Sequence, residues 1–243
     1  MNNLDLGTLY GVSVGTGDPE LITIKGLRLL QQTKIIAFPA GVNGKSGIAR
    51  AIIAPWLQSS QICLPLDFPY VREPATLQAA WRKSADTVWQ YLQKGEDVVF
   101  ACEGDISFYS TFTHLARTLK QIYPNVKTAT VPGVCSPVAA ASDLGIPLTT
   151  DGQRITILPA LYTVQELETA LDTAEVVVLL KVSSVYPQVW QILRQRNLLK
   201  NSSIVEKASC SDRKIYRNLE NRFHLKLPYF SLLIVKCQEN QTK

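Results

Sequence analysis

The chain has 243 residues, of which 46% are hydrophobic and 19% are charged. These values are those of an ordinary globular protein that can bury a core of its own. The 25 lysines and arginines outnumber the 20 aspartates and glutamates, which gives a net charge of only +5. Because these cations are scattered, we expect no nucleic-acid partner. A solvated surface explains the mild excess, and a preference for a small polyanionic ligand is the alternative.

Further classes of protein are also disfavoured. The most apolar run, Val176–Leu180, is much shorter than the roughly 20 residues that cross a bilayer. The first residues, Met1 to Asp5, lack the positive segment and the long apolar stretch of a secretory signal. We therefore expect a cytoplasmic protein with no membrane partner. The five cysteines form no CxxC pair and the two histidines, His114 and His224, lie far apart, so neither a disulfide framework nor a metal site is expected.

The first half of the chain alternates predicted strands with predicted helices. Strands are expected at Thr8–Val14, Lys34–Phe38, Asp97–Ala101 and Val126–Val131. Helices are expected from the N-cap Asp18 and Pro19 onward, near Gly47–Leu57, over Pro74–Lys94 and over Phe112–Gln121. This alternation predicts a parallel sheet that is covered on both faces.

The second half keeps this pattern but ends in strands joined only by loops. Helices are expected at Ala139–Leu144, Val164–Leu171 and Val185–Arg196. Strands are expected at Arg154–Leu158, Glu175–Leu180, Ser203–Lys207, Lys214–Asn218 and Tyr229–Lys236. Strands joined by loops indicate antiparallel pairs. The expected fold class is α/β with two domains, an N-terminal one over residues 1–131 with a mainly parallel sheet and a C-terminal one over residues 132–243 with a mixed sheet.

Turn-rich loops follow three of the predicted strands, namely Gly11–Asp18, Glu103–Asp105 and Pro132–Ser136. Ligands of parallel sheets bind beyond the carboxyl ends of the strands. Glycines there allow close approach of the main chain and leave N–H groups free to donate. The carboxylate of Asp105 could accept hydrogen bonds from ribose hydroxyls or from an amino group. A tight turn explains any one of these loops, but three together predict a ligand site.

Three common motifs fit these loops poorly. Gly15-Thr16-Gly17 begins like a dinucleotide fingerprint, but Glu20 stands at the third glycine position and would repel a pyrophosphate. Gly44-Lys45-Ser46 ends like a P-loop, but the first glycine of that motif falls on Pro39. Gly11 to Gly15 matches the GxSxG pattern around Ser13, yet no helix is expected directly after that serine.

Together and in order, the loops resemble those of the tetrapyrrole methylases, S-adenosylmethionine-dependent enzymes that methylate corrin and sirohaem precursors. The resemblance covers nearly the whole chain. It rests on three stretches of sequence, Val14–Thr23 with Lys25-Gly26, Gly104–Ser110, and Pro132–Ser136 with Ala139–Ala141 and Leu144–Leu148. The sequence departs from the usual pattern at Thr16 and at Ile106, where many members have proline.

The resemblance implies two α/β domains, a homodimer, and a folded S-adenosylmethionine in the cleft between the domains. No metal is implied. Cofactor-binding positions carried over from the family are Gly15, Gly17, Gly104, Asp105, Ile106, Ser107, Phe108, Cys135, Ser136, Ala160, Val182 and Ala208. The substrate would be a tetrapyrrole rich in carboxylates.

The stretch from Leu66-Asp67-Phe68-Pro69 through Trp81 to Thr111 is most similar to the branch that methylates carbon 20 of precorrin-2, or of its cobalt form, in cobalamin biosynthesis. Lys181 would then be a candidate partner for a substrate carboxylate, and a solvated lysine at a strand end is the alternative. A base that removes the proton could be Glu103, Tyr109, Glu206 or water, and no catalytic residue is assigned. Methylation of another ring carbon, of a protein histidine or of ribosomal RNA, and a non-catalytic nucleotide-binding module, stay open as alternatives.

Overall fold

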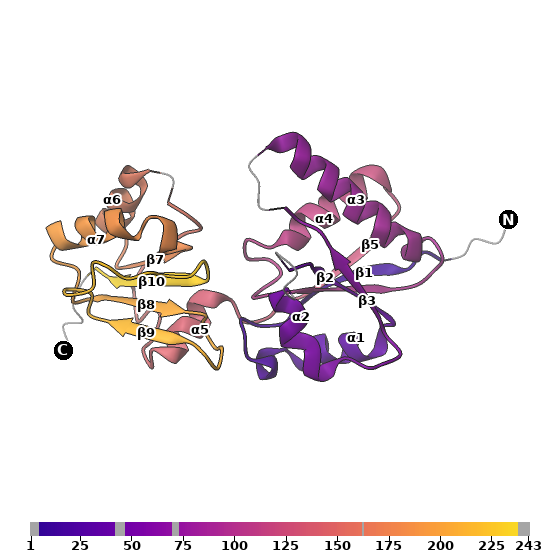
Figure 1. The fold of residues 1–243 in the computed structure, drawn as a ribbon, viewed down its shortest axis with the longest axis horizontal. Coiled ribbons are helices and arrows are strands. Elements are labelled where there is room, and N and C mark those ends of the chain that lie inside the picture. Colours follow the sequence, from indigo (N-terminus) through magenta and orange to yellow (C-terminus); the bar gives the residue numbers. More distant parts are fainter. Residues whose placement is uncertain (1–4, 42–46, 70–72, 162, 238–243) are drawn as a thin grey trace. The chain divides into compact units, whose positions relative to one another are not determined.

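The computed structural model describes residues 5–41, 47–69, 73–161 and 163–237 (Figure 1). The chain divides into two compact units, unit 1 (Met1–Cys135) and unit 2 (Ser136–Lys243). The boundary lies at the end of the third glycine-bearing loop rather than at its start. One reason is that Gly133 N–H donates to the carboxylate of Asp105 in unit 1, which keeps this loop with the first unit.

The sheet of unit 1 is parallel and has the strand order β3-β2-β4-β1-β5. Its strands are β1 (Thr8–Ser13), β2 (Ile35–Pro39), β3 (Ile62–Leu66), β4 (Val98–Cys102) and β5 (Lys127–Val131). The parallel sheet predicted for the first half is therefore confirmed. The strand β3 was not predicted; it is an edge strand that contains Pro65 and has several exposed side chains. An edge strand tolerates proline because one side of it has no pairing partner, and this residue masks the strand pattern.

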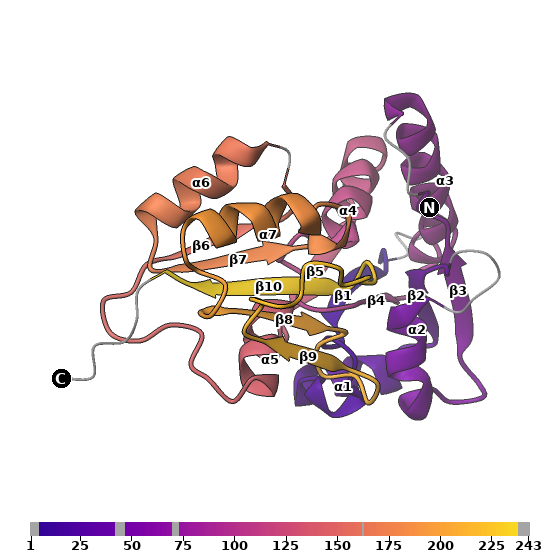
Figure 2. The same ribbon diagram turned by 60° about the vertical axis from the view of Figure 1, so that its left-hand side comes forward.

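Helices cover both faces of this sheet (Figures 1 and 2). They are α1 (Ile24–Gln32), α2 (Ile48–Ile53), α3 (Pro74–Leu92) and α4 (Thr111–Ile122). Side chains of α3 and α4 pack with Leu9 and Phe100 in one buried cluster. Side chains of α1 and α2 pack with Val12 and Ala101 in a second cluster on the opposite face. The two clusters hold the carboxyl ends of β1 and β4 in fixed register.

The first helix begins later than its expected start at Asp18. Asp18 does cap a turn, because its carboxylate accepts from Glu20 N–H at 2.9 Å, but that turn is a single 3-10 turn over Pro19–Leu21. The helix α1 starts at Ile24 behind a second cap, where the Thr23 hydroxyl accepts from Gly26 N–H at 3.1 Å. The expected continuous helix was therefore wrong, because Ile22 and Thr23 adopt extended backbone between the two caps.

Unit 2 has a mixed sheet with the strand order β6-β7-β10-β8-β9. The strands are β6 (Ile155–Leu158), β7 (Val176–Leu180), β8 (Ser202–Glu206), β9 (Lys214–Arg217) and β10 (Ser231–Lys236). Only the β6–β7 pair is parallel among them, since β10 runs against both β7 and β8, and β9 against β8. The mixed sheet expected for the second half is confirmed.

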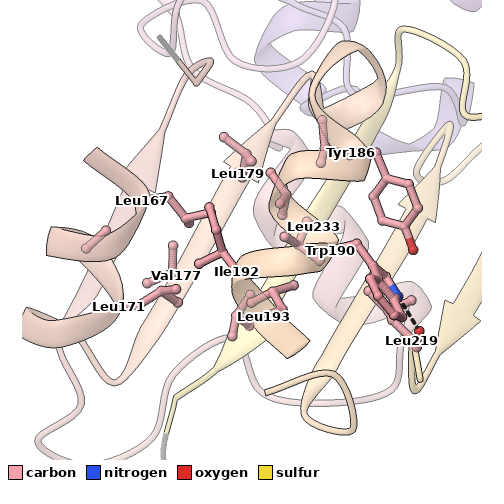
Figure 3. Close-up of a cluster of buried hydrophobic side chains, with 14 of the residues drawn as sticks. Leu167, Leu171, Val177, Leu179, Tyr186, Trp190, Ile192, Leu193, Leu219 and Leu233 are labelled. Carbon is pink, nitrogen blue, oxygen red and sulfur yellow. Dashed lines mark hydrogen bonds between the residues drawn. The ribbon is translucent and has the colours of Figure 1, made fainter. Parts of the chain in front are cut away.

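The helices of unit 2 are α5 (Ser136–Asp143), α6 (Val164–Thr173) and α7 (Tyr186–Gln195). Figure 3 shows leucines, valines and aromatic residues of α6, α7 and the sheet in one buried cluster. Tyr186 O–H donates to Arg222 C=O at 2.8 Å, and Trp190 Nε1–H donates to Leu219 C=O at 2.7 Å. Large aromatic side chains thus bury their rings while their polar atoms stay paired, which fixes the chain that follows β9.

Within the described residues, no helix is both long and apolar enough to span a membrane. No cluster of three or more His, Cys, Asp or Glu side chains in this part of the chain is arranged to hold a metal ion. No disulfide joins the cysteines there. Gly44-Lys45-Ser46, weighed above as the end of a P-loop, lies outside the described residues.

Candidate functional site

Ser13, the last residue of β1, connects three strand ends of unit 1. Its hydroxyl donates to Val131 C=O at the end of β5 and accepts from Ile106 N–H, both at 2.8 Å. The side chain is completely buried. A hydroxyl that is buried and used in this way is not available as a nucleophile, which supports setting aside the GxSxG interpretation.

Gly15 and Gly104 bring the loops after β1 and β4 into direct main-chain contact. Gly104 N–H donates to Gly15 C=O at 2.7 Å, and Val14 N–H donates to Cys102 C=O at 2.9 Å. Both glycines have positive φ, +78° at Gly15 and +73° at Gly104, which side chains of L-residues adopt at a cost. The two predicted glycines are therefore adjacent, and their conformations depend on the absence of a Cβ.

Asp105 supplies the carboxylate that joins the second and third loops. Its Oδ1 accepts from Ser107 N–H at 2.9 Å and also from the Ser107 hydroxyl, and its Oδ2 accepts from Gly133 N–H at 2.6 Å. Burial by itself would raise the pKa of Asp105, but the hydrogen bonds from Ser107, Gly133 and Ser13 together hold that pKa below its usual value. The carboxylate is thus ionised at neutral pH and engaged by protein donors.

Gly15, Gly104 and Gly133, one from each loop, differ in what surrounds them. A Cβ on Gly15 would meet Leu21 Cβ at 2.8 Å, and a Cβ on Gly133 would meet Ser13 Cβ at 2.5 Å. A Cβ on Gly104 would have no described atom within 4 Å. Gly15 and Gly133 permit close packing within the protein, whereas the space beside Gly104 is open.

The remaining predicted residues of unit 1 surround these loops. Ile106 is buried and contributes its N–H to Ser13. Phe108 is partly buried, and its ring lies edge-on to that of Tyr109 with centroids 4.7 Å apart. Gly17 is partly buried beside the Asp18 cap, and Cys135 ends unit 1. Their role in binding a cofactor stays a prediction.

The predicted residues of unit 2 gather at one edge of its sheet. Ala160 follows β6, Lys181 and Val182 follow β7, and Ala208 follows β8. Because β10 is antiparallel to both β7 and β8, the carboxyl ends of β6, β7 and β8 lie at the same edge. Val182 is completely buried and Ala208 is 6% exposed, so their main chains are the groups they could offer to a ligand. Ser136, the first residue of α5, is partly buried.

Two aromatic side chains that were not predicted as site residues, Tyr229 and Phe230, also lie at this edge. Lys181 is exposed, has φ +54°, and holds its Nζ 5.5 Å from the centre of the Tyr229 ring. Phe230 C=O accepts from Lys207 N–H at 2.7 Å. Tyr229 and Phe230 are 43% and 37% exposed. Both residues fall in the expected strand Tyr229–Lys236, but β10 starts only at Ser231. The antiparallel pairing of β10 with β7 is what brings Tyr229 beside Lys181.

Asp143, at the end of α5, fixes the loop after β8. Its carboxylate accepts from Ser209 N–H at 2.7 Å and forms an ion pair with Arg213, whose Nε lies 3.1 Å from Oδ1. Asp143 was not predicted, and Gly133 was predicted as a loop glycine without its contact to Asp105, since both contacts join residues distant in the chain. Asp143 in unit 2 therefore matches Asp105 in unit 1 as a carboxylate that holds strand-end loops.

Residues 8–222 match the family model of the tetrapyrrole (corrin/porphyrin) methylases. The chain belongs to this family. The precorrin-2 C(20)-methyltransferase of Sinorhizobium sp is 29% identical over 97% of both chains. The cobalt-precorrin-2 C(20)-methyltransferase of Salmonella typhimurium is 29% identical over 96% of this chain and 97% of that protein.

A longer relative is the cobalamin biosynthesis protein CobIJ of Mycobacterium tuberculosis, which is 31% identical over 94% of this methylase. The matched region is 46% of CobIJ, so the chain spans about half the length of that relative. Among solved structures, the cobalt precorrin-4 methyltransferase CbiF has a TM-score of 0.73 at 22% identity, with 96% of both chains covered. A uroporphyrin-III C-methyl transferase of Thermus thermophilus complexed with S-adenyl homocysteine has a TM-score of 0.65 at 20% identity, with 94% of this chain and 97% of the other covered. These likenesses show the shared fold.

Proposed function

We propose that this methylase transfers the methyl group of S-adenosylmethionine to carbon 20 of precorrin-2, or of its cobalt form, in cobalamin biosynthesis. Family membership supports methylation of a tetrapyrrole but does not select the ring carbon. The observation that carries the choice of carbon is the similarity to C(20)-methyltransferases over 96% or more of the chain. The metal-free and cobalt enzymes are equally similar at 29% identity, so either form of the ring stays a candidate.

The strand ends of unit 1 fit a methyl donor that is held mainly by main-chain groups. Gly104 presents open space, and the loops around it are joined through Ser13 and Asp105. S-adenosylmethionine supplies an electrophilic methyl group with its own leaving group, so the protein needs to provide alignment rather than a nucleophile. We assign Gly15, Gly17, Gly104 to Phe108, and Cys135 to this role. The Ser107 and Gly133 donors leave the Asp105 carboxylate little capacity for a ligand, so its part is chiefly to position the loops.

The strand-end edge of unit 2 fits an acidic, flat ring. Lys181 offers a cation, and the exposed rings of Tyr229 and Phe230 offer apolar faces. An ammonium group pairs with substrate carboxylates, and aromatic side chains pack against a conjugated macrocycle. We assign Lys181 to the substrate, and the main chains of Ser136, Ala160, Val182 and Ala208 to the donor, as family positions suggest. A homodimer and a cytoplasmic location, both expected above, remain part of this proposal.

The direct test is to incubate the protein with methyl-labelled S-adenosylmethionine and with precorrin-2, either metal-free or loaded with cobalt. We expect one hydrogen of the ring to be replaced by one labelled methyl group, located at carbon 20 by NMR. A label at another carbon would move the enzyme to a different branch of the family. Tight binding of ATP or NAD without any methyl transfer would instead favour a nucleotide-binding module.

A further inference from the structure

Methylation of a meso carbon requires a proton acceptor as well as a methyl donor. Carbon 20 carries one hydrogen before the reaction, and forming the new carbon–carbon bond leaves that carbon with both the hydrogen and the methyl group. The proton must then leave to restore the conjugation of the ring. A positioned carboxylate typically accelerates such a proton transfer by about 10² to 10⁴-fold. Three side chains at the strand ends, Glu103, Tyr109 and Glu206, are chemically able to accept it.

Two of these three side chains are poorly suited by their surroundings. Glu206 is 5% exposed, and its Oε1 accepts from the Tyr216 hydroxyl at 2.9 Å, so it is both shielded and engaged. Tyr109 is 57% exposed, so its side chain is open to solvent. Neither combines shielding from water with a free acceptor atom.

Glu103 has both properties. It follows β4 directly, and its position is set on each side by main-chain hydrogen bonds, from Val14 N–H to Cys102 C=O and from Gly104 N–H to Gly15 C=O. The side chain is partly buried. No described residue donates to its carboxyl group or forms an ion pair with it, whereas the nearby Asp105 carboxylate accepts from Ser107 and Gly133.

The electrostatics of this position agree with the geometry. Burial raises the pKa of Glu103 to about 7, and no cation opposes that shift. The titratable groups beside it in the chain are the Cys102 thiol, whose pKa burial raises to about 11, and the ionised Asp105. A carboxyl group that titrates near neutral pH can both take up a proton and release it again between turnovers.

We propose that Glu103 is the catalytic residue that accepts the proton from carbon 20. Carbon 20 forms its new bond with an electron pair of the ring, and the methyl–sulfur bond breaks with its pair remaining on sulfur. The electron pair of the carbon–hydrogen bond then returns to the ring as the proton moves to the Glu103 carboxylate. The carboxylate later passes this proton to solvent. This inference rests on the proposed function, because it needs a ring carbon that carries a hydrogen.

The test compares Glu103→Gln, Glu103→Asp and the control Glu96→Gln with the wild-type protein. Glu96 lies just before the same strand, at its opposite end, and its side chain is 34% exposed. We expect kcat to fall about 100-fold or more in Glu103→Gln, to recover in part in Glu103→Asp, and to be unchanged in Glu96→Gln. The affinity for S-adenosylmethionine, measured by calorimetry, should be unchanged in all three, which also shows that each variant is folded.

A second measurement separates proton removal from a structural role. With deuterium at carbon 20, Glu103→Gln should show a larger kinetic isotope effect than the wild-type protein, because breaking the carbon–hydrogen bond becomes slow. Suppose that the wild-type protein methylates carbon 20. Full activity of Glu103→Gln, or an isotope effect unchanged from that of the wild-type protein, would then overturn the assignment of Glu103 but not the proposed function. A wild-type protein that transfers no methyl group to carbon 20 would overturn the proposed function as well.

Discussion

In both units of this methylase an aspartate carboxylate holds the strand-end loops, but the two strand ends present different groups. In unit 1, Asp105 accepts from Ser107 and Gly133 and thereby holds loops from β4 and β5 together. In unit 2, Asp143 accepts from Ser209, forms an ion pair with Arg213 and holds the loop after β8 against α5. The loops of unit 1 leave a glycine main chain open at Gly104, whereas the edge of unit 2 presents side chains.

The difference follows from the two kinds of sheet. All strands of unit 1 run in one direction, so loops of similar type converge and can hydrogen-bond to one another. In unit 2 the reversed strand β10 brings its own beginning, with Tyr229 and Phe230, to the edge where β7 and β8 end. A parallel sheet thus builds a rigid main-chain surface, and a mixed sheet adds aromatic and cationic side chains to its edge.

Glycine substitutions provide the strongest test of this contrast. Gly104 in unit 1 and Gly145 in unit 2 both have positive φ, and a Cβ on either would meet no described atom within 4 Å. Gly104→Ala and Gly145→Ala should therefore share a similar backbone cost of about 1 kcal/mol. Only Gly104→Ala should lose affinity for S-adenosylmethionine, by about 100-fold or roughly 2.7 kcal/mol, in calorimetry. Equal affinities in both variants would show that the open face of Gly104 is not the donor site.

The two aspartates form the next pair. Asp105→Asn turns an acceptor of several N–H and O–H donors into a group with its own donors, and should cost about 3 kcal/mol of unfolding free energy. Asp143→Asn should cost about 1 kcal/mol, since its ion pair with Arg213 is partly exposed. Denaturant titration measures both costs, and only Asp105→Asn should also weaken binding of the methyl donor. A donor affinity that Asp105→Asn leaves intact would argue against a role of the joined loops in binding.

The pH dependence of Asp105 has a definite sign. Its pKa is lowered in the folded chain, so its stabilisation is present above the ordinary aspartate pKa of about 4 and is lost as pH falls through the lowered value. The unfolding free energy of Asp105→Asn should therefore fall less with acidification than that of the wild-type protein. Unfolding curves of both proteins, compared across acidic pH, would show this difference.

Glu103 should have the opposite effect on stability. Its pKa is raised from 4.5 to about 7 in the folded chain, so folding becomes less favourable as pH rises from 4.5 to about 7. Above that range the full penalty is present, and we expect about 2 kcal/mol because the side chain is only partly buried. Glu103→Gln should therefore be more stable than wild type at pH 8 by about this amount, and about equally stable at pH 4, in thermal or denaturant unfolding. An identical pH profile in both proteins would contradict a buried, unpaired carboxylate.

Lys181 should show the smallest effect. Its left-handed backbone conformation, φ +54°, costs about 1 kcal/mol in a lysine but little in a glycine. Lys181→Gly should therefore raise the unfolding free energy by up to that amount, while the KM for the tetrapyrrole rises about five-fold through loss of one exposed charge pair. Thermal unfolding and steady-state kinetics measure the two effects. An unchanged KM would assign Lys181 to a solvated strand end.

Most elements could be predicted because their signals are local. The buried strand β7 is one continuous apolar run, and α3 shows helical periodicity over its whole length. The edge strand β3 was missed because exposure and Pro65 remove the apolar pattern. The start of α1 was misplaced because Asp18 and Thr23 are both good caps, and local sequence does not rank them.

The site divides in the same way. By itself, the sequence determined that glycines and Asp105 occupy strand-end turns, since φ preferences and strand patterns are properties of neighbouring residues. Only the tertiary structure decided that Asp105 accepts from Gly133, 28 residues away, and that Ser13 accepts from Ile106, 93 residues away. It likewise decided that Lys181 meets Tyr229 and that Glu103 stays unpaired. These contacts depend on the order and direction of the strands, which bring distant residues to one edge and which no local pattern contains.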